Sequence, residues 1–436
     1  MATSWRQHLG RRIGAAAAVA VAIAVTASVS QAGTDGGRTR LAPAVVHFWS
    51  WDPNMGSLVA QFNKSHPSIK VVLSDINPEY AKLSAAITAG NPPDVAQIEF
   101  QALPQYIATG ALLDLSKDGF DKYKSSFPGW AWSQVTQGGG LYALPQDAGP
   151  AVLFYRKDLF AKYHLAVPTT WPKFAAESKS LHAANPKAYL ADFTANDPSW
   201  LLGLMAQAGA NWFGISNNAW KVSINDRPSI KVANYWQGLI KSGAAKTDPG
   251  WTAQFWHDLT DGSVLTWMSG GWAADLITSQ CPSTAGKWGV AQLPQWGGAP
   301  ASANIGGSTD AVFKATKNKA AAETFVAWLN TTNESWKNLY SKVHLVPAYL
   351  PAFKLKAVNS KLPFFGGQNL APLLKTASSR VNTAFTWSPI TEALYTQAGD
   401  LYGQAISGKG TLAGSVASLQ TWAVQTLKAG GYPVAR

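Results

Sequence analysis

Cysteine is almost absent from this chain of 436 residues, which contains only Cys281. A single cysteine cannot form an internal disulfide, and it cannot supply a multi-cysteine metal site. We therefore expect Cys281 to be a small buried or half-buried side chain. The histidines show no metal-ligand spacing either, so the sequence predicts no metal site and no cofactor.

Charged residues are also scarce, at 14% of the chain against 47% hydrophobic residues. This balance is typical of a globular protein with a large core and excludes a disordered chain. The formal net charge is +12. The basic residues are scattered and no nucleic-acid-binding spacing occurs, so we expect a solvated basic surface, suited at most to an anionic cell wall or membrane face, and no nucleic-acid partner.

Sequence motifs for catalysis are missing. The chain has no Gly-x-Ser-x-Gly elbow, no phosphate-binding loop and no His-Glu-x-x-His helix. Glycoside hydrolysis needs two carboxylates across the scissile bond, and the sequence marks no such pair. A ferric-ion site needs adjacent tyrosines, whereas Tyr142 and Tyr155 are isolated. We predict that the chain is not an enzyme, and a secreted carbohydrate-active hydrolase stays as the alternative.

The one long run of small apolar residues lies at the N-terminus. Arg6, Arg11 and Arg12 precede an Ala/Val-rich run at 13–29, and small residues at 30–32 fit a cleavage site. Residues 1–32 therefore read as a signal peptide and residues 33–43 as a flexible leader. The general secretory and twin-arginine routes both stay open. The mature N-terminus carries no cysteine for lipid attachment, and we expect an exported protein that is extracellular, cell-surface associated or periplasmic.

Strands and helices alternate from residue 44 onward, and 436 residues exceed what one core usually spans, so we expect two domains. Alternation of this kind predicts a parallel sheet covered by helices on both faces. Ligands of such sheets bind beyond the carboxyl ends of the strands. Trp51, Asp52, Gln97 and Glu99 stand at predicted strand ends. The expected strands are 45–49, 69–73 and 94–98, and the expected helices are 56–63 and 80–89.

The stretch at 138–174 organises the rest of the chain. It predicts a short strand at 141–144 that Pro145 ends, and a second strand at 151–155 after a Gly/Pro break. A helix follows, and Thr170 is the expected N-cap of the next helix. Residues beside glycine absorb large dihedral changes, so this break is a candidate crossing between two domains.

Tryptophan is abundant, with twenty residues, many at predicted loop or strand ends. A sugar ring has an apolar C–H face and a rim of hydroxyls, which suits an aromatic platform edged by carboxylates and amides. We expect more than half of the tryptophans to be core residues. Trp51, Trp272 and Trp387 are the expected platforms, and Trp212 is a further candidate.

Three segments resemble one protein family and occur in that family's order. They are YALPQDAGPAVLFYRKDLF…VPTTW at 142–171, TAGNPPDV at 88–95 and MSGGW at 268–272. The chain is similar to the extracellular solute-binding proteins of family 1, carbohydrate-type receptors that feed ABC importers. The resemblance extends from about residue 45 to the C-terminus.

The resemblance implies an α/β fold of the periplasmic-binding-protein-like type II, in which two α/β lobes and a hinge enclose a ligand cleft. It places a second lobe crossing within 297–308 and a third near 345–348. The first lobe is then 44–148 plus 307–347. The second lobe is 149–306 plus 348–436.

The resemblance also implies a monomeric receptor that closes on a sugar and delivers it to the permease of an ABC importer. A glycerophosphodiester or another polar solute is the alternative ligand. Through the resemblance, Gln97 and Glu99 point at the cleft. The remaining expected ligand contacts are Trp51, Asp52, Gln146, Asp147, Trp212, Trp272, Gly306, Gly307 and Trp387.

Overall fold

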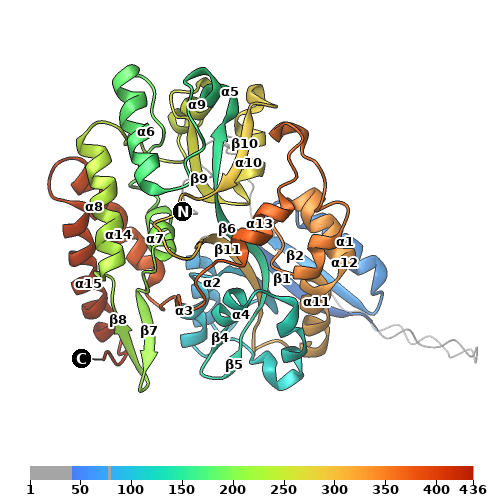
Figure 1. Ribbon diagram of the computed structural model, residues 1–436. Coiled ribbons are helices and arrows are strands. Elements are labelled where there is room, and N and C mark those ends of the chain that lie inside the picture. Colours follow the sequence, from blue (N-terminus) through green and yellow to red (C-terminus); the bar gives the residue numbers. More distant parts are fainter. Residues whose placement is uncertain (1–41, 77–79, 436) are drawn as a thin grey trace, which may run out of the picture.

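The computed structural model describes residues 42–76 and 80–435 (Figure 1). The predicted signal peptide and nearly all of the predicted leader lie outside these residues. The molecule is a mixed α/β structure in which helices cover a central sheet. No helix within the described ranges has the length and apolar character needed to cross a membrane.

The first lobe is built around three parallel strands, as the alternating pattern predicted. They are β1 (Ala44–Ser50), β2 (Ile69–Asp75) and β3 (Val95–Glu99), with β1 in the centre. The strand β11 (Asn304–Val312) then pairs with β3 in the antiparallel sense, so the sheet is mixed and the prediction of a parallel sheet is only partly right. Because β11 returns to the first lobe from the second one, its direction could not follow from the local pattern.

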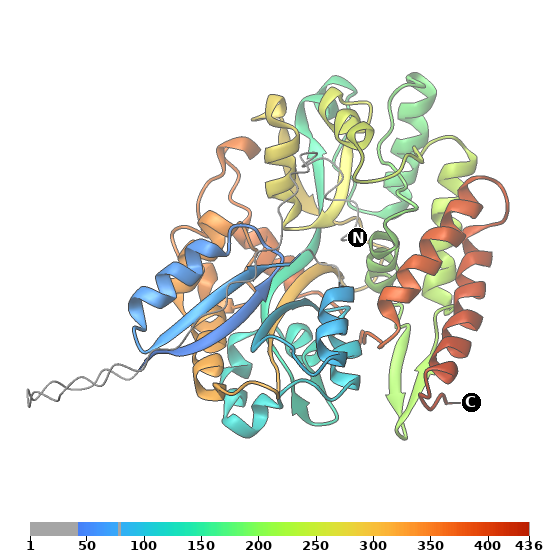
Figure 2. The same cartoon turned by 180° about the vertical axis from the view of Figure 1, so that it is seen from behind.

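Helices cover this sheet on both sides (Figures 1 and 2). In α1, Leu58, Val59 and Phe62 are buried, and the ring of Phe62 packs at 5.0 Å from that of Phe325 on α11. These apolar residues recur at helical spacing and face one core, which is what holds the helices on the sheet. The helices of this lobe are α1 (Gly56–Ser65), α2 (Tyr80–Thr88), α3 (Leu103–Ala108), α4 (Gly129–Gln134), α11 (Lys319–Thr331) and α12 (Asn333–Asn338). The hairpin β4 (Thr136–Gln137) and β5 (Gly140–Leu141) follows α4.

The second lobe has a smaller antiparallel set of strands, with helices around it. Its strands β9 (Thr266–Gly270) and β10 (Trp288–Gln292) both pair with the end of β6 (Leu144–Arg156). Thr170 caps α6 by accepting a hydrogen bond from the backbone N of Lys173, as predicted. Cys281 is fully buried, which confirms its predicted place. The helices here are α5 (Lys157–Lys162), α6 (Trp171–Ala184), α9 (Ala253–Asp261), α10 (Ala273–Gln280) and α13 (Ala371–Ser378).

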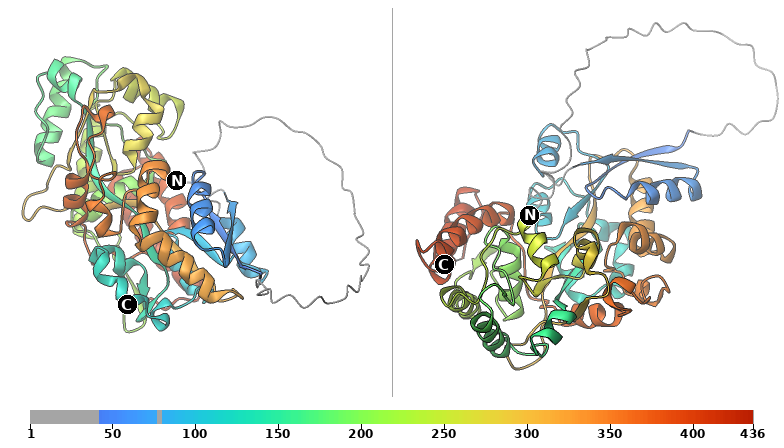
Figure 3. Two further views of the ribbon diagram at one scale, coloured as in Figure 1. Left: turned by 90° about the vertical axis from the view of Figure 1, so that its right-hand side faces the viewer. Right: turned by 90° about the horizontal axis from the view of Figure 1, so that it is seen from above.

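A helical layer completes the second lobe on its outer side. In Figure 3, the C-terminal helices lie on the side of the molecule away from β1 and β2. The layer consists of α7 (Pro198–Gln207), α8 (Arg227–Lys241), α14 (Thr391–Ile406), α15 (Leu412–Ala429) and the hairpin β7 (Phe213–Ser216) and β8 (Ala219–Val222). At least twelve of the twenty tryptophans are buried, so the prediction that most are core residues is confirmed.

The long strand β6 connects the two lobes. Its first half pairs with β11, and its second half pairs with β9 and β10. The predicted stop at Pro145 is wrong, because the strand runs through both Pro145 and Pro150. The pairing with β11 shifts register between Asn304 and Gly307 and again before Thr309, so these prolines lie where the ladder is already irregular.

Three segments pass side by side between the lobes at this point. They are β6, the start of β11, and the chain near residue 346. Ala148 N donates to Val346 O (2.9 Å), and Ala348 N donates to Gln146 O (3.0 Å). The second and third segments are those for which the resemblance implied crossings, and that the chain hinges here stays a prediction. The exact lobe boundaries stay a prediction.

Candidate ligand-binding site

The turn after β1 supplies Trp51 and Asp52 from the first lobe. Asp52 is 8% exposed, and its Oδ1 accepts a hydrogen bond from the backbone N of Asn54 (2.8 Å). Burial raises the pKa of Asp52 to about 6, and the Asn54 hydrogen bond opposes this shift. The indole Nε1 of Trp51 is buried and has no hydrogen-bond partner among the described residues. A buried donor without a partner is costly, so this group is available to a ligand.

The end of β3 supplies Glu99 beside Trp51 and Asp52 on the same edge of the sheet. The hydroxyl of Tyr80, on α2, donates to Glu99 Oε2 (3.1 Å) and accepts from the backbone N of Glu99 (2.9 Å). Burial raises the pKa of Glu99, against hydrogen bonds from Gln101 and Tyr80 that lower it. Tyr80 thus fixes the direction in which the carboxylate points.

Two indole rings of the second lobe pack against each other. Trp272 lies at the N-cap position of α10, and its Nε1 donates to Ile305 O (2.7 Å). Its ring is nearly parallel to that of Trp251, with the ring centroids 6.2 Å apart and an interplanar angle of 23°. Trp251 Nε1 in turn donates to Asp197 Oδ2 (3.2 Å). Both rings are half-buried, so they form an aromatic wall with preset orientations.

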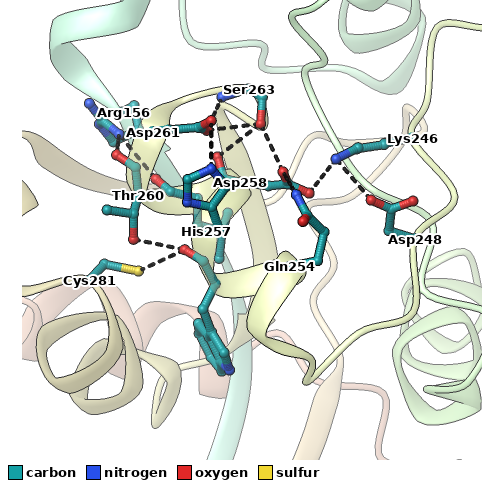
Figure 4. Close-up of polar contacts among 12 residues, drawn as sticks. Arg156, Lys246, Asp248, Gln254, His257, Asp258, Thr260, Asp261, Ser263 and Cys281 are labelled. Atoms are coloured by element: carbon teal, nitrogen blue, oxygen red, sulfur yellow. Dashed lines mark hydrogen bonds and ion pairs between the residues drawn. The ribbon is translucent and has the colours of Figure 1, made fainter.

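A polar network anchors α9, the helix that begins just after Trp251 (Figure 4). Asp258 on this helix forms an ion pair with Lys246, and its Oδ1 accepts from Gln254 Nε2 (2.8 Å). At the end of the helix, Arg156 Nη1 donates to the carbonyl oxygen of Thr260 (3.0 Å). A buried charge is stable only when it is paired in this way. The network therefore anchors α9, the helix that follows Trp251.

The start of α14 supplies Glu392 and its aromatic neighbours. Glu392 Oε1 is buried and has no hydrogen-bond partner in the described part of the chain. Burial raises the pKa of Glu392 to about 7, and the negative charge of Glu99 adds to the shift. Trp387 precedes the helix, is 7% exposed, and has an unpartnered Nε1.

A gap of about 10 Å³ lies beside Trp387, between Gln134 and Leu202, and has room for about one water molecule. A more open hollow of about 220 Å³ lies on the α3–α4 side of Trp387 and reaches Ile215 in the β7–β8 hairpin. No group of three or more potential metal-binding side chains occurs within the described ranges.

A buried hydrogen-bond network lies beneath the site, where the segments cross. Gln97 Nε2 donates to Gln146 Oε1 (2.7 Å), and Gln146 Nε2 donates to Asp310 Oδ2 (2.6 Å). Ser50 donates to Gln97 Oε1 (2.6 Å) and so ties β1 into the same network. Gln97 and Gln146 are both fully buried. Their amide groups join strands of the sheet to each other and are already satisfied by protein partners.

The pKa of Asp310, a member of this network, leads to a prediction of how the stability of the protein depends on pH. Burial raises the pKa of Asp310 to about 7, against hydrogen bonds from Asn330 and Gln146. The unfolded value is about 4, so the folded state binds this proton more tightly, and the free energy of unfolding falls as the pH rises from about 4 to about 7. We expect D310N to remove up to about 1.4 kcal/mol per pH unit from this slope. Urea unfolding at pH 5, 6 and 7 measures it, and a slope equal to that of the wild type contradicts the assignment.

Asp147, Gly306 and Gly307 lie in the crossing segments, where they shape the backbone. Asp147 Oδ1 accepts from the backbone N of Val346 (2.8 Å), which links two crossing segments, and burial raises the pKa of Asp147 well above its usual range. Gly306 and Gly307 have φ values of 74° and 90°, a conformation that disfavours other residues. A Cβ at Gly307 lies 2.7 Å from the carbonyl oxygen of Asp147. These residues shape the connection between the lobes.

The predicted site residues therefore fall into three groups. Trp51, Asp52, Glu99, Trp272 and Trp387 lie at the ends of β1 and β3 or just before α10 and α14, and they stay the predicted ligand contacts. Gln97, Gln146 and Asp147 belong with Gly306 and Gly307 to the crossing segments. Trp212 is 1% exposed, and its Nε1 donates to Ser229 Oγ (2.9 Å), so it is a core residue of the second lobe.

Sequence reasoning missed Tyr80, Asp197, Glu392 and Tyr395, and it named Trp251 only as one of many tryptophans. Tyr395 shows why, because it lies one helical turn after Glu392 on α14, where sequence periodicity only marks it as a core position. Its ring packs at 6.3 Å from that of Trp387. The one sequence signal for Glu392 was its place as an acidic residue at the start of a long C-terminal helix.

Comparison with known proteins agrees with this architecture. The family model of the bacterial extracellular solute-binding proteins matches residues 51–334. A lactose-binding protein of Rhizobium radiobacter is 27% identical over 349 residues, which covers 74% of this chain and 80% of that protein.

Two solved structures are also similar. The galacto-N-biose/lacto-N-biose I-binding protein of an ABC transporter from Bifidobacterium longum, in complex with lacto-N-biose, is 30% identical with a TM-score of 0.81, and the match covers 92% of this chain and 100% of that one. An ABC-transporter-associated binding protein from B. animalis subsp. lactis, in complex with beta-1,6-galactobiose, is 28% identical with a TM-score of 0.79, covering 90% and 100%.

Proposed function

The chain belongs to the bacterial extracellular solute-binding proteins, and from this membership we propose that it captures a sugar between its lobes and delivers it to an ABC importer. The observation that carries the proposal is that the indole of Trp51 and the carboxylates of Asp52 and Glu99 lie together at the carboxyl ends of β1 and β3. Rings present a face to sugar C–H groups, and carboxylates accept hydrogen bonds from hydroxyls. The sugars named for the similar proteins support the same class of ligand.

Each residue has a distinct role in this proposal. Trp51, Trp272 and Trp387 stack on sugar rings, and the unpartnered Nε1 groups of Trp51 and Trp387 donate to sugar oxygens. Asp52 and Glu99 accept from hydroxyls. A ligand that lacks one of these hydroxyls leaves a buried group unpaired, which is how such a site discriminates between similar sugars.

Capture follows from a shift between open and closed forms. The ligand contacts both lobes only when they are closed, so binding stabilises the closed form. The three crossing segments at β6, β11 and residue 346 are the proposed hinge. The proposed lobes are 44–148 plus 307–347, and 149–306 plus 348–436. The proposed partner is an ABC permease, which receives the closed monomer after export directed by residues 1–32.

A thermal-shift screen of the exported chain tests the proposal. A ligand that binds only the folded state raises the melting temperature, by an amount that depends on its concentration relative to Kd. We expect lactose or another di- or oligosaccharide to do so, with no product released, and glycerophosphodiesters to have no effect. If no sugar raises the melting temperature, the proposal fails.

Glu99 and Glu392 favour a second candidate, a secreted carbohydrate-active hydrolase. Hydrolysis uses two carboxylates, one of them with a raised pKa, and both of these glutamates have raised pKa values. The same sugars incubated overnight with the protein distinguish the two functions. Intact sugar recovered in full supports the receptor, and smaller reducing sugars that disappear in E392Q support the enzyme.

A further inference from the structure

The hollow on the α3–α4 side of Trp387 is lined by uncharged side chains. Its volume is about 220 Å³, and it lies between segments that the proposed boundaries assign to different lobes, with Pro104 and Gln137 on one side and Ile215 on the other. Ile215, on β7, is 50% exposed and is one of two large apolar side chains that are exposed in the described part of the chain. None of the described residues that line the hollow is acidic, basic or a histidine. A charged group of a ligand would therefore have no counter-ion here.

Aromatic side chains form part of the wall of this hollow. The rings of Phe385 and Trp387 lie edge to face, with their centroids 4.8 Å apart and an interplanar angle of 77°. On the facing helix α4, Ser133 Oγ donates to the carbonyl oxygen of Thr383 (3.3 Å), so this helix and the loop before Trp387 are tied together. Protein contacts thus hold the wall in place, and its apolar surface suits the C–H groups of a sugar ring.

The small gap beside Trp387 adjoins the hollow, because Gln134, Phe385 and Trp387 line both of them. The gap measures about 10 Å³, which is room for about one water-sized group. Gln134 Oε1 and Trp387 Nε1 are buried, and neither atom has a hydrogen-bond partner among the described residues. One acceptor and one donor are therefore left unsatisfied on two residues that share this space.

A hydroxyl is the ligand group that satisfies both atoms at once. Gln134 Oε1 can only accept a hydrogen bond, and Trp387 Nε1 can only donate one. A hydroxyl donates and accepts through a single oxygen, whereas a carboxylate only accepts and a protonated amine only donates. Because a buried polar group without a partner is costly, a ligand hydroxyl that enters the gap gains affinity.

We propose that the hollow receives one uncharged ring of the sugar, and that a hydroxyl of this ring enters the gap and bonds to both Gln134 and Trp387. This inference rests on the proposed sugar-binding function and adds a subsite to it, because none of Trp51, Asp52 and Glu99 lines the hollow. A sugar with an acid or an amine on this ring is disfavoured, since the hollow offers its charge no partner.

Filling the hollow from its exposed side tests where the ring binds. The larger side chain of I215W occupies the hollow. S216W is the matched control, because Ser216 is also exposed on β7 but does not line the hollow, and neighbouring side chains of a strand point to opposite faces. Calorimetric titration uses the exported chain with lactose, maltose, maltotriose and the most stabilising sugar of the thermal-shift screen. We expect the tightest-binding sugar to bind I215W at least about tenfold more weakly than the wild type, and S216W within about threefold. The melting temperature of each variant shows that it is folded.

Monodeoxy derivatives of the tightest-binding sugar test the gap. We expect at least one of them to bind the wild type at least about tenfold more weakly than the parent sugar, because it leaves buried groups unpaired. In Q134L this ratio should fall by at least about threefold, since one of the two bonds is already lost. Q137L is the control and should keep the ratio, because Gln137 lines the hollow but not the gap.

Three results overturn the inference. Equal affinities of I215W and S216W would place the sugar ring elsewhere and leave the sugar receptor intact. A deoxy ratio that is the same in Q134L as in the wild type would show that no sugar hydroxyl bonds to Gln134 and that water alone fills the gap. If no sugar of the thermal-shift screen binds the wild type, the proposed function itself has failed and the inference fails with it.

Discussion

Replacing Gly149 with alanine is expected to destabilise the protein more than any other small substitution at the lobe crossing. A Cβ at this position lies 1.9 Å from the carbonyl oxygen of Ile305, and main-chain atoms cannot move aside as a flexible side chain can. The backbone N of Gly149 also donates to Asn304 Oδ1 (2.8 Å), so separating the strands breaks this bond. We expect a loss of at least about 3 kcal/mol in the free energy of unfolding.

Urea unfolding followed by tryptophan fluorescence measures this loss. Gly238→Ala is the matched control, because the same change on α8 has no atom within 4 Å of the new Cβ. Alanine in a helix interior is preferred to glycine by about 1 kcal/mol, so this control should be slightly stabilising. Equal effects of the two substitutions would show that β6 and β11 are not packed as closely as described.

Replacing Trp51 with alanine is expected to abolish most of the sugar affinity at little cost in stability. The ring is half-buried, and its Nε1 has no hydrogen-bond partner among the described residues, so the substitution removes no hydrogen bond that the structure describes. Loss of an aromatic contact at the centre of a binding site costs about 2–4 kcal/mol, which is about a 30- to 1,000-fold rise in Kd. Calorimetry with the most stabilising sugar of the thermal-shift screen measures it.

Trp422→Ala provides the control for this experiment. Trp422 is a half-buried tryptophan on α15, in the outer helical layer, and it packs against the core. Its replacement should lower the melting temperature while Kd changes by less than about threefold. If both variants lose affinity equally, Trp51 does not contact the sugar and its effect is a general one on folding.

The sequence predicted much of the fold because the first lobe is built from local signals. Each of β1, β2 and β3 is a short apolar run followed by a helix, and Thr170 has the side chain that an N-cap needs. The local sequence around Pro145 wrongly predicted that a strand ends there. Its missing N–H ends an isolated strand, but here an irregular partner strand more than 150 residues away in sequence determines the outcome.

The candidate site could be predicted only on its first-lobe side. Trp51 and Asp52 come after the end of β1, Glu99 is the last residue of β3, and strand ends collect at one edge of a sheet. Glu392 and Tyr395 reach the same place from a helix near the C-terminus, and no spacing rule relates residue 99 to residue 392. The structure shows that Trp212 is a buried core residue. The sequence could not show this, because a tryptophan just after a helix can face either a ligand or the core.

The late position of β11 in the chain bears on the order in which the first sheet can form. This strand lies between β3 and β6, yet about 200 residues separate it from β3 along the chain. An emerging polypeptide therefore cannot complete its first sheet until roughly three-quarters of it has been synthesised. Until then, the edge of β3 that pairs with β11 has no partner strand, so the first sheet is completed late in synthesis.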